Sequence, residues 1–327
     1  MNRFKRLLGG LAVSCTLAAP GARAADFPAK PVTIIVPFAA GGPVDIVARS
    51  VAVPMADVLK RPVIVENDAG AAGIVGSVKA MRAAPDGYTL LLGHAGTHAF
   101  NAALNPALQY RPIEDFKTVA MLANMPSILN VSAGSRFKDV KELLTYARAN
   151  PKKLNFGSAG SGSASHLAAM MLIDATKIEV TFVSYRGSNP AFTDLISGQL
   201  DALFDTSAQA VPQVLGKRVR ALAVTSDQRL PALPGTVTLA ESCCKNLSLE
   251  IWYGLFAPRN TPDNILQTLE AAALASIGDP RYRATMQKAN VRVPELAKAG
   301  RQEFEAVIRR DLVRFGDLAK RTEAKVE

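Results

Sequence analysis

Residues 33–45 read TIIVPFAAGGPVD and join a short apolar run, a turn of small residues and the start of a helical pattern. The apolar run ends at Pro37, the glycines are Gly41 and Gly42, and the helical pattern begins near Val44. A helix N-terminus presents unpaired backbone N–H groups and the positive end of the helix dipole, which together favour an anion such as a carboxylate. Similar turns also connect strands to helices without any ligand, so both interpretations stay open at this point.

The same order of strand, turn and helix recurs along most of the chain. Short apolar runs typical of buried strands occupy residues 32–36, 63–65, 89–92, 154–156, 180–185, 202–204, 220–224 and 252–257. Apolar residues recur at helical spacing in stretches that include residues 74–83, 137–147, 191–197, 262–277 and 301–318. Strands that alternate with helices predict an α/β fold, in which helices cover a parallel sheet.

Two sites interrupt these patterns. Pro54 lies inside the first helical pattern, and because proline removes a backbone donor we expect the helix to kink or end near Val53. The apolar runs 116–123 and 127–131 are separated by Asn-Met-Pro at 124–126, which predicts two strands. We expect the chain to cross from one lobe to the other at this separation.

The first 25 residues have the features of a cleaved signal peptide. Three basic residues precede a short apolar segment, and Ala-Arg-Ala at 22–24 fits the small-residue cleavage rule. Cys15 leaves lipid attachment as an alternative, although the residue three positions before it is an alanine. No later stretch of the sequence is long and apolar enough to predict a membrane helix. We therefore expect a soluble protein that is exported after removal of residues 1–25.

Composition and charge narrow the class of protein. The 327 residues are 49% hydrophobic, 20% charged and 6% aromatic, which is typical of a globular chain large enough for two lobes. Residues 1–24 hold four basic and no acidic residues, so their removal lowers the formal net charge from +10 to +6. A single tryptophan and the absence of a long basic run argue against a nucleic-acid partner. The remaining positive charge favours encounter with anionic solutes.

The strand-turn-helix units fall into two groups. We assign residues 26–126 and 246–327 to lobe 1 and residues 127–245 to lobe 2, with crossing strands between them. Ligands of open α/β sheets bind in the crevice at the carboxyl ends of the strands. The ligand site is therefore expected in a cleft between the lobes, where the turns of both lobes face each other.

Residues 157–166, GSAGSGSASH, form a second Gly-rich turn between a predicted strand and a predicted helix. The pattern matches neither the dinucleotide fingerprint nor a phosphate loop with its lysine, so we expect no nucleotide cofactor. Serine hydroxyls and backbone amides in such a turn suit a carboxylate or its bridging waters. Ser165, His166 and Asp205 also suggest a hydrolytic triad, but adjacent side chains usually point apart and the chain has no G-x-S-x-G elbow.

Several further residues each have two interpretations. His94 and His98 could meet on a helix, but Gly96 between them and the lack of a clear third ligand favour loop or capping roles over a zinc site. Asp205 follows a predicted strand, where it either pairs with an ammonium group of the ligand or caps a helix. Phe38 is expected to form a pocket wall.

Two more features stay open at the level of the sequence. Arg186 either neutralises a second carboxylate of the ligand or lies on the surface as an ordinary cation. The neighbouring Cys243 and Cys244 either remain thiols, link two molecules or close a small strained ring. The spacing of these cysteines does not suggest a metal site.

Taken together, these stretches resemble the extracytoplasmic solute receptors of tripartite tricarboxylate transporters, also called the Bug family. The motifs keep their order over nearly the whole mature chain. They are residues 37–42 with Asp45, 65–67 with Gly70 and Gly73, 85–90, 157–168, 185–188, 222–226, 239–242, 252–255 and 257–258.

The resemblance implies a two-lobed periplasmic-binding-protein fold, type II-like, that closes on a ligand in the cleft. It implies a receptor that captures a small organic carboxylate for a tripartite transporter with two integral-membrane subunits. It implies no catalysis, cofactor or metal, and we expect a monomer. A ligand sensor for a membrane signalling protein is the alternative on the same fold, and a secreted hydrolase is a third hypothesis.

Carried over position by position, the resemblance assigns seven residues to ligand binding. They are Phe38, Gly42 and Asp45 in the first turn, Ser158, Ser163 and His166 in the second, and Asp205 at the position that faces the distal part of the ligand. The sequence departs from the family pattern at Pro43 and Val44, which stand where a small residue and a threonine are common. A side-chain hydroxyl is lost there, while the backbone donors after the proline remain.

Overall fold

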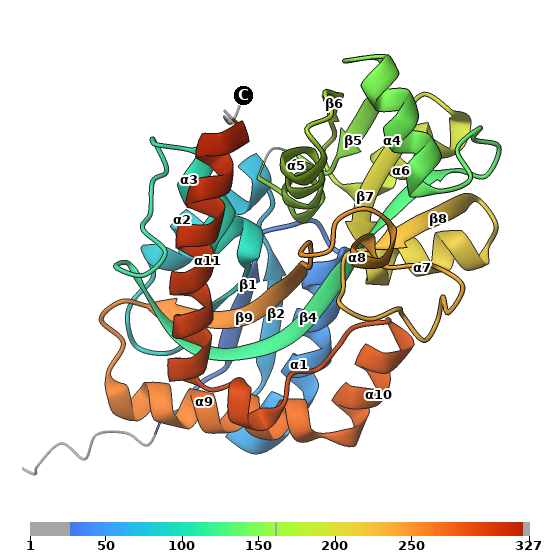
Figure 1. Cartoon of the computed structure of the whole chain (residues 1–327). Coiled ribbons are helices and arrows are strands. Elements are labelled where there is room, and N and C mark those ends of the chain that lie inside the picture. Colours follow the sequence, from blue (N-terminus) through green and yellow to red (C-terminus); the bar gives the residue numbers. More distant parts are fainter. Residues whose placement is uncertain (1–26, 161, 323–327) are drawn as a thin grey trace, which may run out of the picture.

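The computed structural model describes residues 27–160 and 162–322, so the predicted signal peptide lies outside the described residues. One mixed sheet runs through the molecule in the strand order β2-β1-β3-β9-β4-β7-β5-β6, and β8 pairs with β4 (Figure 1). The strands are β1 (Val32–Val36), β2 (Val63–Asn67), β3 (Thr89–His94), β4 (Phe116–Ser132), β5 (Asn155–Ser158), β6 (Thr181–Ser184), β7 (Ala202–Thr206), β8 (Val219–Val224) and β9 (Glu250–Pro258).

Helices connect most of these strands and cover the sheet. The α-helices are α1 (Pro43–Leu59), α2 (Ile74–Met81), α3 (Asn101–Leu104), α4 (Val140–Ala149), α5 (Ala164–Thr176), α6 (Ser188–Ser197), α7 (Ser207–Leu215), α8 (Leu239–Ser242), α9 (Asp263–Gly278), α10 (Pro280–Lys288) and α11 (Arg301–Thr322). Three short helical turns are η1 (Ala71–Gly73), η2 (Gly96–Phe100) and η3 (Leu296–Lys298). Within residues 27–160 and 162–322, a helix of the length and apolar character that spanning a bilayer requires is absent.

The predicted α/β fold is confirmed, with two parallel units in one sheet. β1 pairs in parallel with β2 and β3, and β5 pairs in parallel with β6 and β7. The units are joined through antiparallel strands, because β9 lies between β3 and β4, and β4 pairs onward with β7 and β8. The carboxyl ends of both parallel units therefore lead into the turns that the sequence singles out.

The predicted break at residues 124–126 is wrong, because β4 is one continuous strand of 17 residues. Pro126 is the last residue of β4 to pair with β9, opposite Glu250. Ser127 is the first to pair with β7, and its N–H donates to the Thr225 hydroxyl at 2.8 Å. The missing N–H of the proline thus falls where the strand changes partners, and this placement removes no ladder hydrogen bond that a central strand would need.

Of the two predicted effects of Pro54, a kink or an end of the helix near Val53, the end is wrong, while the kink stays a prediction. α1 continues through Pro54 to Leu59 and ends at Lys60, whose backbone is left-handed. Val47, Val51 and Met55 recur every four residues on the side of α1 that is buried. This burial on both sides of the proline outweighs the local cost of about 3 kcal/mol that an interior proline imposes on a helix.

The main hydrophobic core extends over both groups of strands. It joins side chains of β1, β3 and β9 to side chains of β5 and α5, while a smaller cluster lies under α6 and α7. α11 packs against β4, α3 and α5 and so contacts both groups (Figure 1). The division of the chain into lobes at residues 126 and 245 stays a prediction.

Candidate ligand-binding site

The first turn places backbone donors at the start of α1. Gly42 is the N-cap residue, with an extended backbone and no side chain that could cap the helix. Pro43 has no N–H, so the next donors that the helix leaves unpaired are those of Val44 and Asp45. The turn therefore keeps free backbone donors at the start of the helix, while position 44 carries a valine and no hydroxyl; that these donors bind an anion stays a prediction.

Asp45 holds this turn in shape. Its buried carboxylate accepts hydrogen bonds from the Gly41 N–H, Arg49 Nε and Asn67 Nδ2, each at 2.9 Å. Burial alone raises the pKa of Asp45, but the hydrogen bonds from Arg49, Gly41 and Asn67 lower it to a value below 3.8. Asn67 also donates to the carbonyl of Phe38 at 3.1 Å. Because both oxygens of Asp45 are engaged by the protein, this residue acts by positioning the turn.

Aromatic side chains stand beside the first turn. The ring of Phe38 lies 5.0 Å from that of His94, and the His94 ring lies 5.5 Å from that of Tyr253. Gly73 is close to Phe38, since a Cβ built on Gly73 would come within 2.9 Å of the Phe38 ring. Phe38 is partly buried, as a pocket wall would be, although its contact with a ligand stays a prediction.

The second turn is held by its own hydroxyl groups. Ser158 is buried at the end of β5, and Ser163 caps α5 by accepting the His166 N–H at 3.3 Å. The hydroxyls of Ser163 and Ser165 lie 2.9 Å apart, and Ser165 accepts the Ala159 N–H at 2.8 Å. The turn is thus a compact set of oriented hydroxyls and amides directly before a helix N-terminus.

His166 adds a neutral donor to this set. Its Nδ1 accepts the Gly162 N–H at 3.0 Å, which places the ring proton on Nε2. Burial lowers the pKa of His166 to about 4, so the ring stays neutral at physiological pH. Its ring centroid lies 5.6 Å from that of Phe100 and 5.0 Å from that of Phe182.

The hydrolytic triad is not assembled among the described residues. The Ser165 hydroxyl is hydrogen-bonded to the Ala159 N–H and to the Ser163 hydroxyl. No hydrogen bond joins Ser165 to the ring of His166. The Nδ1 of His166 is occupied by Gly162 rather than by the carboxylate of Asp205. The geometry therefore gives no support to nucleophilic catalysis at Ser165.

Asp205 ends β7 as a buried carboxyl group, only 3% exposed. Its Oδ1 accepts the Thr206 N–H at 2.7 Å, while Oδ2 has no hydrogen-bond partner in the described part of the chain. Burial raises the pKa of Asp205 to about 6, an increase that the nearby Ser188 hydroxyl and Thr206 offset in part. The interpretation of Asp205 as a helix cap is wrong, because Thr206 is the N-cap of α7 and no side chain caps that helix.

Several contacts link each of the two turns to neighbouring elements that they share or approach. Gln209 of α7 donates through Nε2 to the Gly41 carbonyl at 3.2 Å. A Cβ built on Gly96 would come within 2.7 Å of the Gly162 carbonyl. A Cβ on Gly162 would overlap Asn101 Oδ1. The first turn, η2 and the second turn therefore converge on one region between the two groups of strands.

Sequence reasoning missed three residues of this region. Asn67 fixes the first turn, Tyr253 lies beside His94, and Gln209 reaches the first turn from α7. Asn67 is the last residue of β2, so its position at a carboxyl strand end was an available signal. Tyr253 lies on β9, and Gln209 lies on the side of α7. No local sequence pattern marks either residue as part of this region.

His94, the last residue of β3, and His98, in η2, are core residues rather than loop residues. His94 and His98 are both buried, and the ring of His98 is stacked on Phe256 with centroids 4.0 Å apart. Burial lowers the pKa of each to about 3. No group of three or more candidate metal ligands occurs among residues 27–160 and 162–322.

The family model described as tripartite tricarboxylate transporter family receptor matches residues 47–323 of this chain. A curated relative, the UPF0065 protein in the tcbD-tcbE intergenic region of Pseudomonas sp. strain P51, is 39% identical over 278 residues. That match covers 84% of this chain and 82% of the relative.

Two solved structures share the whole fold. The periplasmic binding protein BugD is 33% identical, has a TM-score of 0.85, and is matched over 91% of this chain and 99% of its own. MatC from Rhodopseudomonas palustris, solved with bound malate, is 35% identical with a TM-score of 0.84. The MatC match covers 89% of this chain and 99% of that protein. The architecture is therefore that of a periplasmic binding protein.

Proposed function

Because the chain belongs to the receptor family of the tripartite tricarboxylate transporters, the Bug family, we propose that it captures a small organic carboxylate in the periplasm for delivery to such a transporter. Membership in this solute-binding family points away from enzymatic activity. The partners in this proposal are two integral-membrane subunits, and the signal peptide at residues 1–25 directs export.

One observation carries the proposal: two turns rich in neutral donors both lie against the end of β3 and η2, the first through Phe38 and His94 and the second through Gly162 and Gly96. The first supplies backbone N–H groups at the start of α1, and the second supplies the hydroxyls of Ser158 and Ser163 with the Nε2–H of His166. Neutral donors at helix N-termini stabilise a carboxylate without a buried cation. In this proposal one carboxylate of the ligand lies between the turns, against Phe38.

In this proposal Asp205 contacts the distal part of the ligand. Its Oδ2 is buried and unpartnered within the described residues, and an unmade hydrogen bond of this kind costs about 1–3 kcal/mol. A ligand that donates a hydrogen bond from a hydroxyl or ammonium group would recover that cost. The preferred ligand is therefore a short dicarboxylate with one such donor, a class that includes malate, which MatC binds.

Thermal unfolding of the mature chain, residues 26–327, tests the proposal against succinate, malate, aspartate and the matched amides. A ligand at about a hundred times its Kd adds roughly 2.7 kcal/mol, which raises the Tm by roughly 2–4 °C per kcal/mol in a chain of this size. We expect malate or aspartate to stabilise more than succinate, and the amides not at all. Equal stabilisation by acids and amides would refute an anion site.

Asp205→Asn serves as the matched variant for the distal end of the ligand. The amide keeps the shape of the side chain but no longer pairs with an ammonium group, so aspartate should lose more affinity than succinate. The protein should be refolded from denaturant before the measurement, which removes any ligand carried over from the host. A uniform loss for all acids would place Asp205 outside the distal subsite.

Delivery to a transporter requires a separate test. Cells that contain the two membrane subunits and lack this receptor should accumulate the labelled acid only when the full-length chain is restored. A variant that cannot bind, such as Gly162→Ala, should not restore uptake. Normal uptake without the receptor would leave ligand sensing as its role.

A further inference from the structure

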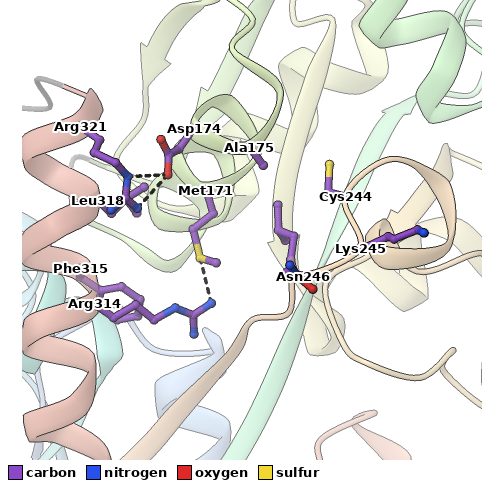
Figure 2. Close-up of a pocket in the computed structure, with 11 residues that line it drawn as sticks. Met171, Asp174, Ala175, Cys244, Lys245, Asn246, Arg314, Phe315, Leu318 and Arg321 are labelled. Atoms are coloured by element: carbon purple, nitrogen blue, oxygen red, sulfur yellow. Dashed lines mark hydrogen bonds and ion pairs between the residues drawn. The ribbon is translucent and has the colours of Figure 1, made fainter.

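A pocket away from the two turns lies between α5, α11 and the segment that follows α8. Its volume is about 320 Å³, within the range that holds small ligands. Figure 2 shows the residues around it, with α11 on one side and Cys244, Lys245 and Asn246 on the other. None of the seven residues assigned to the ligand site lines this pocket.

The pocket has an apolar floor. Buried side chains of α11 and of the segment after α8 form it together with a partly buried methionine of α5. These floor residues are Met171, Cys244, Leu247, Phe315 and Leu318. The floor therefore suits an alkyl or aromatic group that leaves water.

The walls of the pocket carry an excess of positive charge. Arg314, Arg321 and Lys245 line it, against a single acid, Asp174. Asp174 is already paired, since it accepts hydrogen bonds from Arg321 at 2.8 and 3.0 Å and forms an ion pair with Lys177 at 2.8 Å. Arg314 and Lys245 have no carboxylate within ion-pair distance among the described residues.

Arg314 is the group that points to a ligand. It extends from α11 toward the middle of the pocket, below Met171 (Figure 2). It donates to the Ser248 carbonyl at 2.7 Å and lies 4.0 Å from the Met171 sulfur, which leaves most of its five N–H donors unused within the described residues. Arg314 is exposed, and desolvation by the surrounding side chains lowers its pKa below the usual value, although the Asp311 carboxylate one turn before it acts in the opposite direction.

We propose that this pocket is a second binding site, for a small monocarboxylate with an apolar body. The carboxylate pairs with the Arg314 guanidinium in a bidentate hydrogen bond, and the apolar body lies on the floor formed by Met171, Leu247 and Phe315. Lys245 adds a second cation at the rim. Inorganic anions fit less well because they leave the apolar floor exposed to water.

The site joins two parts of the chain that are distant in sequence. α5 and α11 pack against each other and are bridged by the Arg321–Asp174 ion pair at the edge of the pocket. A ligand seated on Met171 of α5 and Arg314 of α11 would therefore add a further contact between these helices.

Methyl NMR of the mature chain, labelled at methionine, tests the proposal with hexanoate as the probe and hexanamide as its neutral match. Met171 lines the pocket, while Met55 and Met286 are fully buried elsewhere and serve as internal controls. We expect the Met171 signal to shift and saturate with hexanoate, with a Kd on the order of 1 mM for so small a probe. Hexanamide should leave the Met171 signal in place.

Two variants with one control make the test specific. Arg314→Gln should weaken hexanoate binding about tenfold or more, because the charged hydrogen bonds are lost. Arg309→Gln is the control, since this exposed arginine of the same helix pairs with Glu305 and does not line the pocket. Ala175→Trp keeps every charge and blocks the exposed rim, so it should also abolish the Met171 shift.

The proposal is overturned if Met171 responds equally to hexanoate and hexanamide, or if Arg314→Gln binds like Arg309→Gln. Unchanged Met55 and Met286 signals verify that each variant is folded. If Arg314→Gln does not fold, the Ala175→Trp variant decides the outcome, since hexanoate binding that survives the blocked rim refutes the site. The result does not depend on the carboxylate site of the two turns, because Met171 does not belong to it.

Discussion

The two Gly-rich turns present similar donors but are held in shape in different ways. The first is fixed by an ionised carboxylate, Asp45, whose partners include Asn67 at the end of a neighbouring strand. The second is fixed by neutral groups of its own sequence, the hydroxyls of Ser163 and Ser165 and the ring of His166. The first turn should therefore be sensitive to the loss of one charge, and the second to crowding and to protonation.

The largest effect is expected where the second turn is closest to the rest of the site. Gly162 has a φ of +80°, and a Cβ on it would overlap Asn101 Oδ1. Gly162→Ala should cost about 3 kcal/mol or more of stability through strain and overpacking. Because the turn must move to relieve the overlap, we also expect ligand affinity to fall by about a hundredfold or more. Calorimetric titration with the acid that stabilises the unmodified protein most measures the affinity. Gly134→Ala, where a Cβ meets nothing within 4 Å, should bind normally.

The first turn should depend for its stability on the charge of Asp45. Asp45→Ala leaves the Gly41 N–H, Arg49 and Asn67 without their acceptor and should destabilise the protein by about 3 kcal/mol. Asp57→Ala, on the same helix, removes only an exposed pair with Arg281 and should cost no more than about 1 kcal/mol. Chemical denaturation compares the two variants. Equal losses would show that Asp45 does not hold the turn.

The two turns should lose their contributions to stability at different pH values. The pKa of His166 is about 4 in the folded chain and 6.5 in the unfolded chain. Below pH 6.5 the unfolded chain therefore binds more protons at this residue than the folded chain does. Stability is constant above pH 6.5 and falls toward pH 4, by about 2–3 kcal/mol for this residue. The contribution of Asp45, whose pKa is lowered, is present above pH 3.8 and lost below it.

Denaturation curves recorded from above pH 6.5 down to pH 4 measure this effect. His166→Asn should flatten the slope of stability against pH. The slope that remains comes from His94 and His98, with pKa values of about 3, and from Asp205, whose raised pKa gives a contribution of the opposite sign. An unchanged slope in the variant would mean that His166 is protonated in the folded chain without cost.

The smallest effect concerns the cap of the second turn. Ser163→Ala removes the N-cap of α5 and should cost about 1 kcal/mol of stability. Thr238→Ala removes the capping box of α8, away from the site, and should cost a similar amount. Only the Ser163 variant should also lose ligand affinity. If both variants bind equally well, the Ser163 hydroxyl acts as a cap alone.

Local order was readable from the sequence, because strand, turn and helix depend on neighbouring residues. The turns at 38–45 and 157–166 were found in this way. The continuity of β4 was not, since Pro126 is tolerated only because the strand exchanges β9 for β7 and β8 at that point. The brace between Asn67 and Asp45 spans 22 residues, and the contact from Gln209 to Gly41 spans 168. Such contacts depend on tertiary packing and leave no local pattern.

The placement of β9 governs the order in which this chain can fold during synthesis. β9 comprises residues 250–258 but lies between β3 and β4, strands that are completed by residue 132. A chain that emerges N-terminus first therefore exposes two facing strand edges until more than a hundred later residues have followed. Pairing at such sequence separation is slow and leaves strand edges open to aggregation. The same arrangement means that the complete sheet cannot form before residue 258 is available, so the chain acquires its native topology only late in synthesis.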